Sequence, residues 1–138
     1  MSENVDIVRT LFARWTDQDL DGVLECVDPE IVWDWSASRS PWSGVYRGHE
    51  GLIRHWTDQL EAWESFSVEV LDPVDLDSDW LMTVAAVRAR GRGSGIEMEA
   101  SGAWLWRFRD GRILSGKLFQ TKEEALAAAG VSVEEAQD

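Results

Sequence analysis

Apolar residues recur at every third or fourth position through the first half of the chain, the period of a helix packed on a core. One such stripe consists of Val5, Val8, Leu11, Phe12 and Trp15, and a second of Leu52, Ile53, Trp56, Leu60 and Trp63. The pattern predicts, in order, a helix over residues 4–18, a short helix from Asp19 to the Asp28-Pro29 pair, a strand over 31–35, a loop over 36–47 and a helix over 48–63.

The second half shows the two-residue alternation of β-strands. The predicted elements are a strand around residues 66–70, a polar turn over 72–79, strands over 80–91, 96–108 and 112–120, and a terminal helix over 122–129. Helices and a small strand followed by an antiparallel meander predict an α+β fold. We expect a single domain over residues 1–138, with N-terminal helices packed on one face of a curved, mainly antiparallel sheet.

The Asp110-Gly111 pair is a strong signal for a two-residue hairpin loop, so it fixes which residues face each other. In the absence of a bulge, Phe108 lies opposite Ile113 and Trp104 lies opposite Lys117. This register places the ammonium group of Lys117 on the inner face, beside Trp104.

The preceding hairpin is supported by charge. If residues 91–95 turn the chain, Arg90 lies opposite Glu97 and Arg88 lies opposite Glu99. Two opposite-charge pairs in one register favour that pairing.

The faces of the sheet follow from these registers. The even positions of the strand 96–108 are all apolar or small, so we expect them to face the helices. The other face also carries apolar residues, namely Trp80, Met82, Val84, Ala103, Leu105, Leu114 and Leu118. Because an apolar patch on the uncovered side of a sheet usually marks a partner surface, a homodimer through this outer face is expected.

Composition narrows the classes of function. The chain has 138 residues, of which 44% are hydrophobic, and 13 Lys and Arg against 26 Asp and Glu give a net charge of −13. That charge argues against binding to nucleic acid or to an anionic membrane. There is no signal-peptide pattern and no apolar run of about 20 residues, and Cys26 is the one cysteine, so a cytoplasmic location is expected.

Nine tryptophans are the most unusual feature of the composition. Tryptophan offers a large flat apolar surface with one N–H donor, which suits both a core and a pocket for rings. The residues expected to line a pocket for a small apolar or aromatic molecule are Trp33, Trp35, Trp42, Trp56, Trp104 and Trp106.

Four polar residues are candidates for chemistry in the same space. Asp34 lies between two tryptophans, a setting that suits a general acid or base, although strand alternation can equally leave it in water. His49 is expected near the centre of the apolar stripe of its helix, either as a base or donor or bonded to loop backbone, whereas His55 falls off the edge of that stripe. Tyr46 can donate from its phenol, and Lys117 can stabilise an enolate or be neutralised by Asp34.

No metal or other cofactor is expected. His49 and His55 are separated by about 240° around a helix, so they cannot share a metal ion. Asp75, Asp77 and Asp79 begin like a calcium loop, but that loop's glycine and final glutamate are missing.

Five segments in this order resemble the SnoaL-like branch of the nuclear transport factor two-like superfamily. They are Asp19-Leu20-Asp21-Gly22, Asp28-Pro29-Glu30-Ile31-Val32-Trp33-Asp34, Tyr46-Arg47-Gly48-His49-Glu50-Gly51, Trp106-Arg107-Phe108-Arg109-Asp110-Gly111-Arg112-Ile113 and Glu123-Glu124-Ala125-Leu126. The resemblance covers about residues 4–130 and implies a cone-shaped, cofactor-free, often dimeric α+β domain with a pocket between helices and sheet.

The superfamily includes ketosteroid isomerase, polyketide cyclases, small epoxide hydrolases, dehydratases and many binding proteins. The isomerase's helix-one tyrosine would fall at Leu11 and its oxyanion-site aspartate near Trp104, so only its general base, at Asp34 or Trp35, has a possible counterpart. Three hypotheses follow: an isomerase, cyclase or dehydratase that acts by proton transfer, a binding module without chemistry, and a structural dimer whose tryptophans fill the core.

Overall fold

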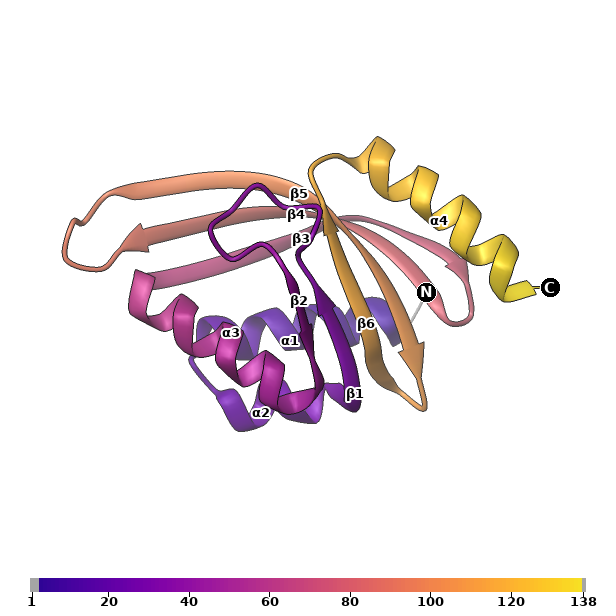
Figure 1. The fold of residues 1–138 in the computed structure, drawn as a ribbon, viewed down its shortest axis with the longest axis horizontal. Coiled ribbons are helices and arrows are strands. Elements are labelled where there is room, and N and C mark those ends of the chain that lie inside the picture. Colours follow the sequence, from indigo (N-terminus) through magenta and orange to yellow (C-terminus); the bar gives the residue numbers. More distant parts are fainter. Residues whose placement is uncertain (1–2, 138) are drawn as a thin grey trace.

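Six strands form one curved sheet with helices on both of its faces. The structure, a computed structural model, describes residues 3–137 and the side chains of residues 3–130. Its elements are α1 (Glu3–Thr16), α2 (Leu20–Glu25), β1 (Val27–Asp34), β2 (Val45–Arg47), α3 (Gly48–Ala62), β3 (Trp63–Asp77), β4 (Trp80–Gly91), β5 (Glu97–Arg109), β6 (Arg112–Phe119) and α4 (Lys122–Gln137). Figure 1 shows α1, α2 and α3 on one face and α4 on the other. The predicted α+β class, with N-terminal helices on a mainly antiparallel sheet, is confirmed.

The strand order is β2-β1-β6-β5-β4-β3. Neighbouring strands are antiparallel except β1 and β6, which pair in parallel. The parallel pair places Trp33 and Asp34, near the end of β1, beside Gly116 and Lys117 of β6. The β1 strand therefore connects the N-terminal helices to the meander at the position of the candidate residues.

Several strands are longer than predicted. Because the backbone at Val27 already pairs with Ile113, β1 begins there rather than at residue 31. The predicted loop ends in the short strand β2, and the predicted polar turn over 72–79 is largely the end of β3, where irregular pairing with β4 continues as far as Asp77. Backbone hydrogen bonding sets these limits, and a side-chain pattern does not reveal it.

The β5–β6 hairpin has the predicted two-residue loop, with positive φ at Asp110 and Gly111 (52° and 76°). Phe108 lies opposite Ile113 as expected, but an irregularity then shifts the register by one residue, so that Arg107 lies opposite Ser115. A bulge of this kind moves every later side chain of the strand to the other face.

The predicted place of Lys117 is wrong for this reason. Lys117 lies opposite Leu105, and Trp104 instead lies opposite Leu118. The ammonium group is therefore on the outer face of the sheet, which α4 covers in part.

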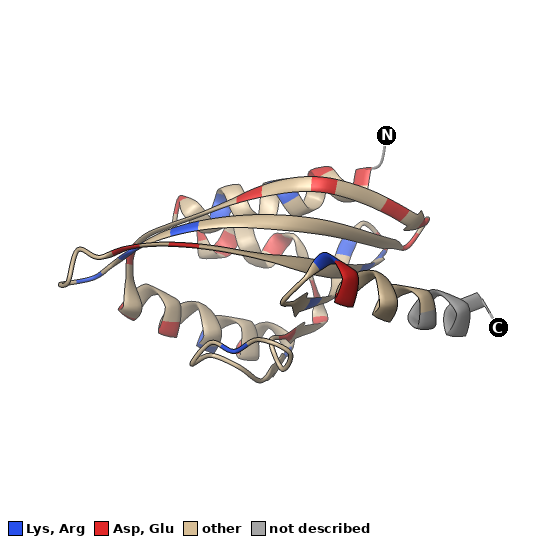
Figure 2. Cartoon of the chain, turned by 90° about the horizontal axis from the view of Figure 1, so that it is seen from above, with Lys and Arg blue, Asp and Glu red and all other residues tan. Residues whose placement is uncertain are grey.

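The predicted β4–β5 register is confirmed. Arg88 lies opposite Glu99 and Arg90 opposite Glu97. Arg88 forms an ion pair of 3.3 Å with Glu99, while Arg90 pairs with Glu64 of β3 at 3.2 Å. These charges lie on the exposed part of the outer face, and Figure 2 shows acidic positions on the helices as well as on the sheet.

Apolar residues form a core on each face of the sheet. The main core lies under α1, α2 and α3, and the smaller one lies between the sheet and α4. The smaller core buries Met82, Ala103 and Leu105, which were expected to form an uncovered partner surface. The chain's own last helix covers these residues, and Leu118 belongs to the main core, so an open apolar face is not what the structure shows.

Candidate functional site

Aromatic rings form a continuous group on the inner face of the sheet. This group, the interior cluster, consists of Phe12, Trp15, Trp33, Trp35, Tyr46, His55, Trp56, Trp104 and Trp106. Trp104 stacks on Trp106 at 4.8 Å between ring centroids, and Trp33 lies 4.7 Å from Trp104. Such pairs contribute about 0.5–1.5 kcal/mol each beyond their burial.

The β6 bulge also provides the surface on which two of the indoles lie. It places Gly116 on the inner face opposite Trp106. A Cβ atom at Gly116 would come within 2.7 Å of the Trp106 ring and 3.3 Å of the Trp33 ring. Glycine at this position therefore allows both rings to contact the sheet backbone.

His55 lies fully buried in the interior cluster, with an exposed fraction of 0%. Its ring is 4.5 Å from that of Trp35 and 4.7 Å from that of Tyr46, centroid to centroid. The imidazole therefore lies among rings contributed by β1, β2 and α1.

The sequence analysis placed His55 outside the helical stripe, and this was wrong. The buried residues of α3 are Gly51, Leu52, His55, Trp56 and Gln59, whereas Ile53 is 36% exposed. A Cβ atom at Gly51 would lie 3.0 Å from the carbonyl carbon of Tyr46, so glycine lets this side of the helix approach β2. The close approach turns His55 and Gln59 towards the sheet.

Burial controls the ionisation of the interior cluster. Loss of hydration lowers the pKa of His55 to about 3, and burial raises the pKa of Tyr46 above its ordinary value. Both groups are therefore uncharged near neutral pH. The interior cluster therefore presents hydrogen-bonding groups and ring surfaces rather than charge.

Four buried polar atoms of this site lack a hydrogen-bond partner among the described residues: Trp33 Nε1, Trp35 Nε1, His55 Nδ1 and Gln59 Oε1. The remaining ring nitrogen of His55, Nε2, lies 3.4 Å from Gln59 Nε2. Trp106 differs, because its Nε1–H donates to Thr83 Oγ1 at 2.9 Å. An unpaired buried polar group costs about 1–3 kcal/mol, so hydrogen bonds from a bound molecule would be favourable here.

Asp34 faces away from the interior cluster. Strand alternation turns Ile31 and Trp33 into the main core, and Asp34 to the face that also carries Lys117. The two side chains form a long ion pair of 3.9 Å. The Asp34 carboxylate also accepts hydrogen bonds from the backbone N–H (2.8 Å) and hydroxyl (2.6 Å) of Ser36, so it stabilises the turn that follows β1.

His49 and Tyr46 each form a hydrogen bond to a backbone carbonyl. The half-buried His49 bonds through Nε2 to the backbone carbonyl of Val27 at 3.2 Å, which is the backbone-bonded alternative considered for it. Tyr46 places its ring in the interior cluster, but its hydroxyl donates to the Trp42 carbonyl at 2.7 Å. These bonds occupy the Tyr46 O–H donor and the Nε2 atom of His49.

The expected pocket residues divide into two groups. Trp33, Trp35, Trp56, Trp104 and Trp106 come together in the interior cluster. Trp42 does not join them, because it lies in the β1–β2 loop against Trp63, at 5.9 Å between ring centroids.

Four residues of this site were missed as site residues: Phe12, Trp15, His55 and Gln59. Trp15 shares its helical stripe with Phe12, and His55 lies three residues after Leu52, so these positions could have been found from helical spacing. Gln59 gives no such signal, because a buried glutamine cannot be told from an exposed one by periodicity.

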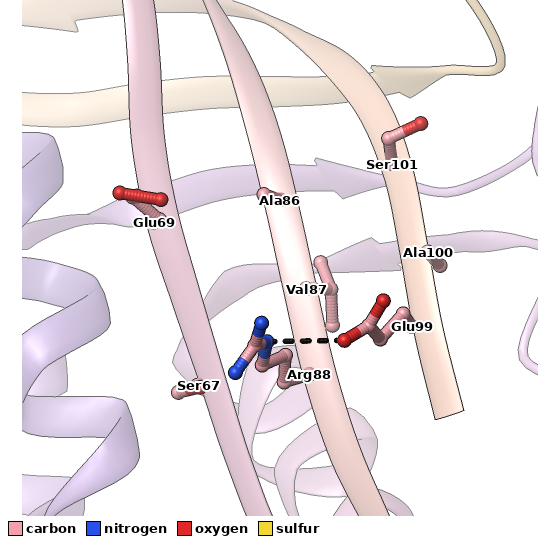
Figure 3. Close-up of a pocket in the computed structure, with 8 residues that line it drawn as sticks. All are labelled: Ser67, Glu69, Ala86, Val87, Arg88, Glu99, Ala100 and Ser101. Atoms are coloured by element: carbon pink, nitrogen blue, oxygen red, sulfur yellow. Dashed lines mark ion pairs between the residues drawn. The ribbon is translucent and has the colours of Figure 1, made fainter. Parts of the chain in front are cut away.

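A concave region lies on the outer face of β3, β4 and β5. This hollow of about 830 Å³ is lined by Ser67, Glu69, Ala86, Val87, Arg88, Glu99, Ala100 and Ser101. Figure 3 shows the Arg88–Glu99 ion pair across it. The hollow is on the opposite face of the sheet from the interior cluster, and its lining is mostly small or polar.

Two further features were sought in the described part of the chain. Within it, no group of three or more His, Cys, Asp or Glu side chains is placed to hold a metal ion. Within it, too, no helix has the length and apolar character needed to cross a membrane.

Solved structures share this fold at low sequence identity. TerC, crystallised with polyporic acid, has a TM-score of 0.74 at 15% identity, with 93% of this chain and 98% of TerC covered. RV0760c from Mycobacterium tuberculosis, in complex with estradiol-17beta-hemisuccinate, has a TM-score of 0.74 at 13% identity, with 89% and 97% covered. A putative polyketide cyclase from Xanthomonas campestris pv. campestris has a TM-score of 0.68 at 12% identity, with 92% and 96% covered.

Sequence comparison gives the family. A search of curated proteins finds no significant match. The SnoaL-like domain matches residues 8–116, which is most of the 138-residue chain and includes the whole of the interior cluster. With the cone-shaped arrangement of helices on a curved sheet, this match shows that the chain belongs to the SnoaL-like domain family.

Proposed function

We propose that this domain binds a small, largely apolar or aromatic molecule within the interior cluster. The observation that carries the proposal is the set of four unpaired buried polar atoms among the rings. Tryptophans that only fill a core gain nothing from unpaired N–H groups, because each such group costs free energy. A ligand that pairs with these atoms recovers that cost.

The ring surfaces suit the same kind of ligand. Stacked and tilted indoles present flat apolar faces, as for Trp104 on Trp106 at 4.8 Å and Trp33 on Trp104 at 4.7 Å between ring centroids. Two proteins of the same fold were crystallised with small molecules, polyporic acid and estradiol-17beta-hemisuccinate. This supports ligand binding as a property that the fold can carry.

We propose that a ligand reaches the interior cluster past Trp35 and Tyr46. Both side chains are half-buried, so the cluster reaches the surface there. Trp35 follows the last residue of β1, and its backbone is held by a 2.7 Å hydrogen bond to the Gly44 carbonyl. We expect the Trp35 side chain to move to admit the ligand while the loop backbone stays in place.

The alternative to binding alone is proton-transfer chemistry on the bound molecule. In it, Asp34 would act as base or acid, and His49, Tyr46 and Lys117 would polarise the substrate. The geometry favours binding over this alternative. Asp34 and Lys117 pair on the outer face, and the buried imidazole of His55 has a pKa of about 3, so it is a weak base near neutral pH.

Homodimerisation through the outer face of the sheet is a second part of the proposal. The open part of that face is the hollow between β3 and β5, where α4 does not reach. Its exposed Arg88 and Glu99 can pair with their counterparts across a two-fold axis, because a two-fold interface brings the same patch of each subunit together.

Titration of intrinsic tryptophan fluorescence tests the binding proposal. A panel of small aromatic, terpenoid and polyketide-like compounds should include members that change the emission saturably. Trp35→Ala should then weaken binding at least tenfold, because Trp35 lies against His55 at the surface end of the interior cluster. Trp35 is a better probe than Trp104. Trp104 is buried, and truncating a buried tryptophan costs about 3–5 kcal/mol of stability.

Trp80→Ala is the matched control, because Trp80 is also half-buried but packs on the other face under Arg107. It should leave the affinity within about twofold. Asp34→Asn should leave both the affinity and the chemical fate of the ligand unchanged, whereas a large loss of turnover would favour the proton-transfer alternative. A flat response to every compound would contradict binding.

A further inference from the structure

The unpaired atoms of the interior cluster also specify the chemistry of a ligand. We infer that the ligand is an uncharged ring compound with an oxygen substituent that accepts hydrogen bonds from the indole N–H groups of Trp33 and Trp35 and donates one to the His55–Gln59 pair. This inference rests on the proposed function and defines its class of ligand.

The indoles provide two donors. Trp33 Nε1–H and Trp35 Nε1–H are buried without a partner among the described residues, and an indole nitrogen can only donate. The Trp33 side chain is 1% exposed, so solvent does not satisfy it. An acceptor on the ligand is therefore needed to satisfy each of these groups.

The His55–Gln59 pair provides one further donor and one acceptor. If the Gln59 amide nitrogen donates across the 3.4 Å contact to His55 Nε2, then Nδ1 of the neutral ring carries the proton and Gln59 Oε1 is the free acceptor. If the amide is turned over, Gln59 accepts from Nε2–H, Nδ1 becomes the free acceptor and the amide NH₂ becomes the free donor. Both arrangements leave one donor and one acceptor.

The site therefore offers three unpaired donors and one acceptor whichever tautomer is present. Carbonyl and hydroxyl oxygens match this set, because both accept hydrogen bonds and a hydroxyl also donates one. A hydrocarbon leaves all four groups unpaired. A protonated amine offers only donors and would be buried among uncharged rings without a carboxylate, since Asp34 points to the other face, and an unpaired buried charge is costly.

Four compounds with one bicyclic skeleton test this inference by calorimetric titration: tetralin, α-tetralone, α-tetralol and α-aminotetralin. We expect tetralol to bind more tightly than tetralone, and tetralone at least tenfold more tightly than tetralin. Aminotetralin, which is protonated at neutral pH, should bind least tightly. This ranking needs only the unaltered protein.

A double variant tests the role of the His55–Gln59 pair. His55→Leu with Gln59→Met replaces both groups with apolar side chains, so the core loses unpaired polar atoms and should stay folded. Tetralol should then lose its advantage over tetralone, because only tetralol has a hydroxyl to donate. Gln120→Met makes the amide exchange outside the interior cluster, where Gln120 donates to the Ala37 carbonyl, and should preserve the ranking.

The outcomes separate this inference from the proposed function. Tetralin or aminotetralin binding as tightly as the oxygenated compounds would overturn the inference and leave the binding proposal standing. An unchanged preference for tetralol in the double variant would overturn the assignment to His55 and Gln59. Failure of all four compounds, together with a flat response to the wider fluorescence panel, would overturn both.

Discussion

His55 enters the folded core in its neutral form. Its side chain is fully buried between rings of β1, β2 and α1, and burial lowers its pKa from about 6.5 to about 3. In the unfolded chain the same imidazole is hydrated and titrates near its ordinary value. One residue therefore connects the ligand site to the pH dependence of stability.

The direction of this effect follows from proton binding. Above about pH 6.5 both states are neutral at His55, and the residue adds no pH dependence. Below that pH the unfolded chain takes up a proton that the folded chain excludes, so the free energy of unfolding falls by about 1.4 kcal/mol per pH unit until the pH approaches 3.

Denaturant unfolding of the wild type and of His55→Gln measures this contribution. Between pH 6.5 and pH 4.5 the wild type should lose about 2–3 kcal/mol more than the variant, because glutamine does not titrate. His49→Gln is the matched control, since His49 is only half-buried and bonds to a backbone carbonyl. It should lose stability like the wild type. Parallel curves for the wild type and His55→Gln would contradict a buried neutral imidazole.

At the scale of the elements, α4 determines which part of the outer face is open. It buries Met82, Ala103 and Leu105 within the chain and leaves the hollow lined by β3, β4 and β5. A dimer through this face would therefore rely on small and charged residues more than on the apolar residues first considered. A substitution meant to disrupt the dimer must therefore be placed in the hollow rather than among the residues that α4 covers.

Sedimentation velocity at micromolar concentration tests the dimer. We expect a species of twice the mass of the chain, and Ala86→Arg should convert it to monomer by placing a long charged side chain in the hollow. Thr57→Arg, on the exposed side of α3, should leave it dimeric. If the wild type sediments only as a monomer, the proposed interface is wrong.

The sequence predicted elements better than it predicted which way their side chains point. Apolar periodicity identified α1 and β4, the Asp110-Gly111 pair identified the last hairpin, and opposite charges predicted the β4–β5 register. A single bulge in β6 then moved Lys117 to the other face, and a close contact at Gly51 turned His55 inwards. Both features depend on backbone packing between distant segments, which side-chain patterns do not encode.

In the candidate site, too, some residues could be predicted from the sequence and others could not. Five of the six tryptophans expected to line a pocket meet in the interior cluster, because bulky apolar residues at strand and helix spacing face a core by default. The polar residues were harder to place, since Asp34 and Gln59 are each compatible with water or burial until the neighbouring strands are known. Gln59 in particular required the three-dimensional structure.

The molecule encloses aromatic rings between three helices and one face of a sheet, and most of its described charged side chains lie on the outside. Its SnoaL-like match over residues 8–116 and the likeness to solved structures agree on this architecture. The interior of this chain holds uncharged polar groups that have no hydrogen-bond partner among the described residues. The central claim is that a ligand completes their hydrogen bonds.

Nuclear magnetic resonance of the indole N–H groups tests that claim most directly. The nine tryptophans give separate signals that single Trp→Phe variants can assign. On saturation with α-tetralol, the signals of Trp33 and Trp35 should move downfield as their N–H groups form hydrogen bonds, while those of Trp80 and of Trp106, already bonded to Thr83, should change little. Unmoved signals from Trp33 and Trp35 under saturating ligand, or a larger shift at Trp80, would contradict the account.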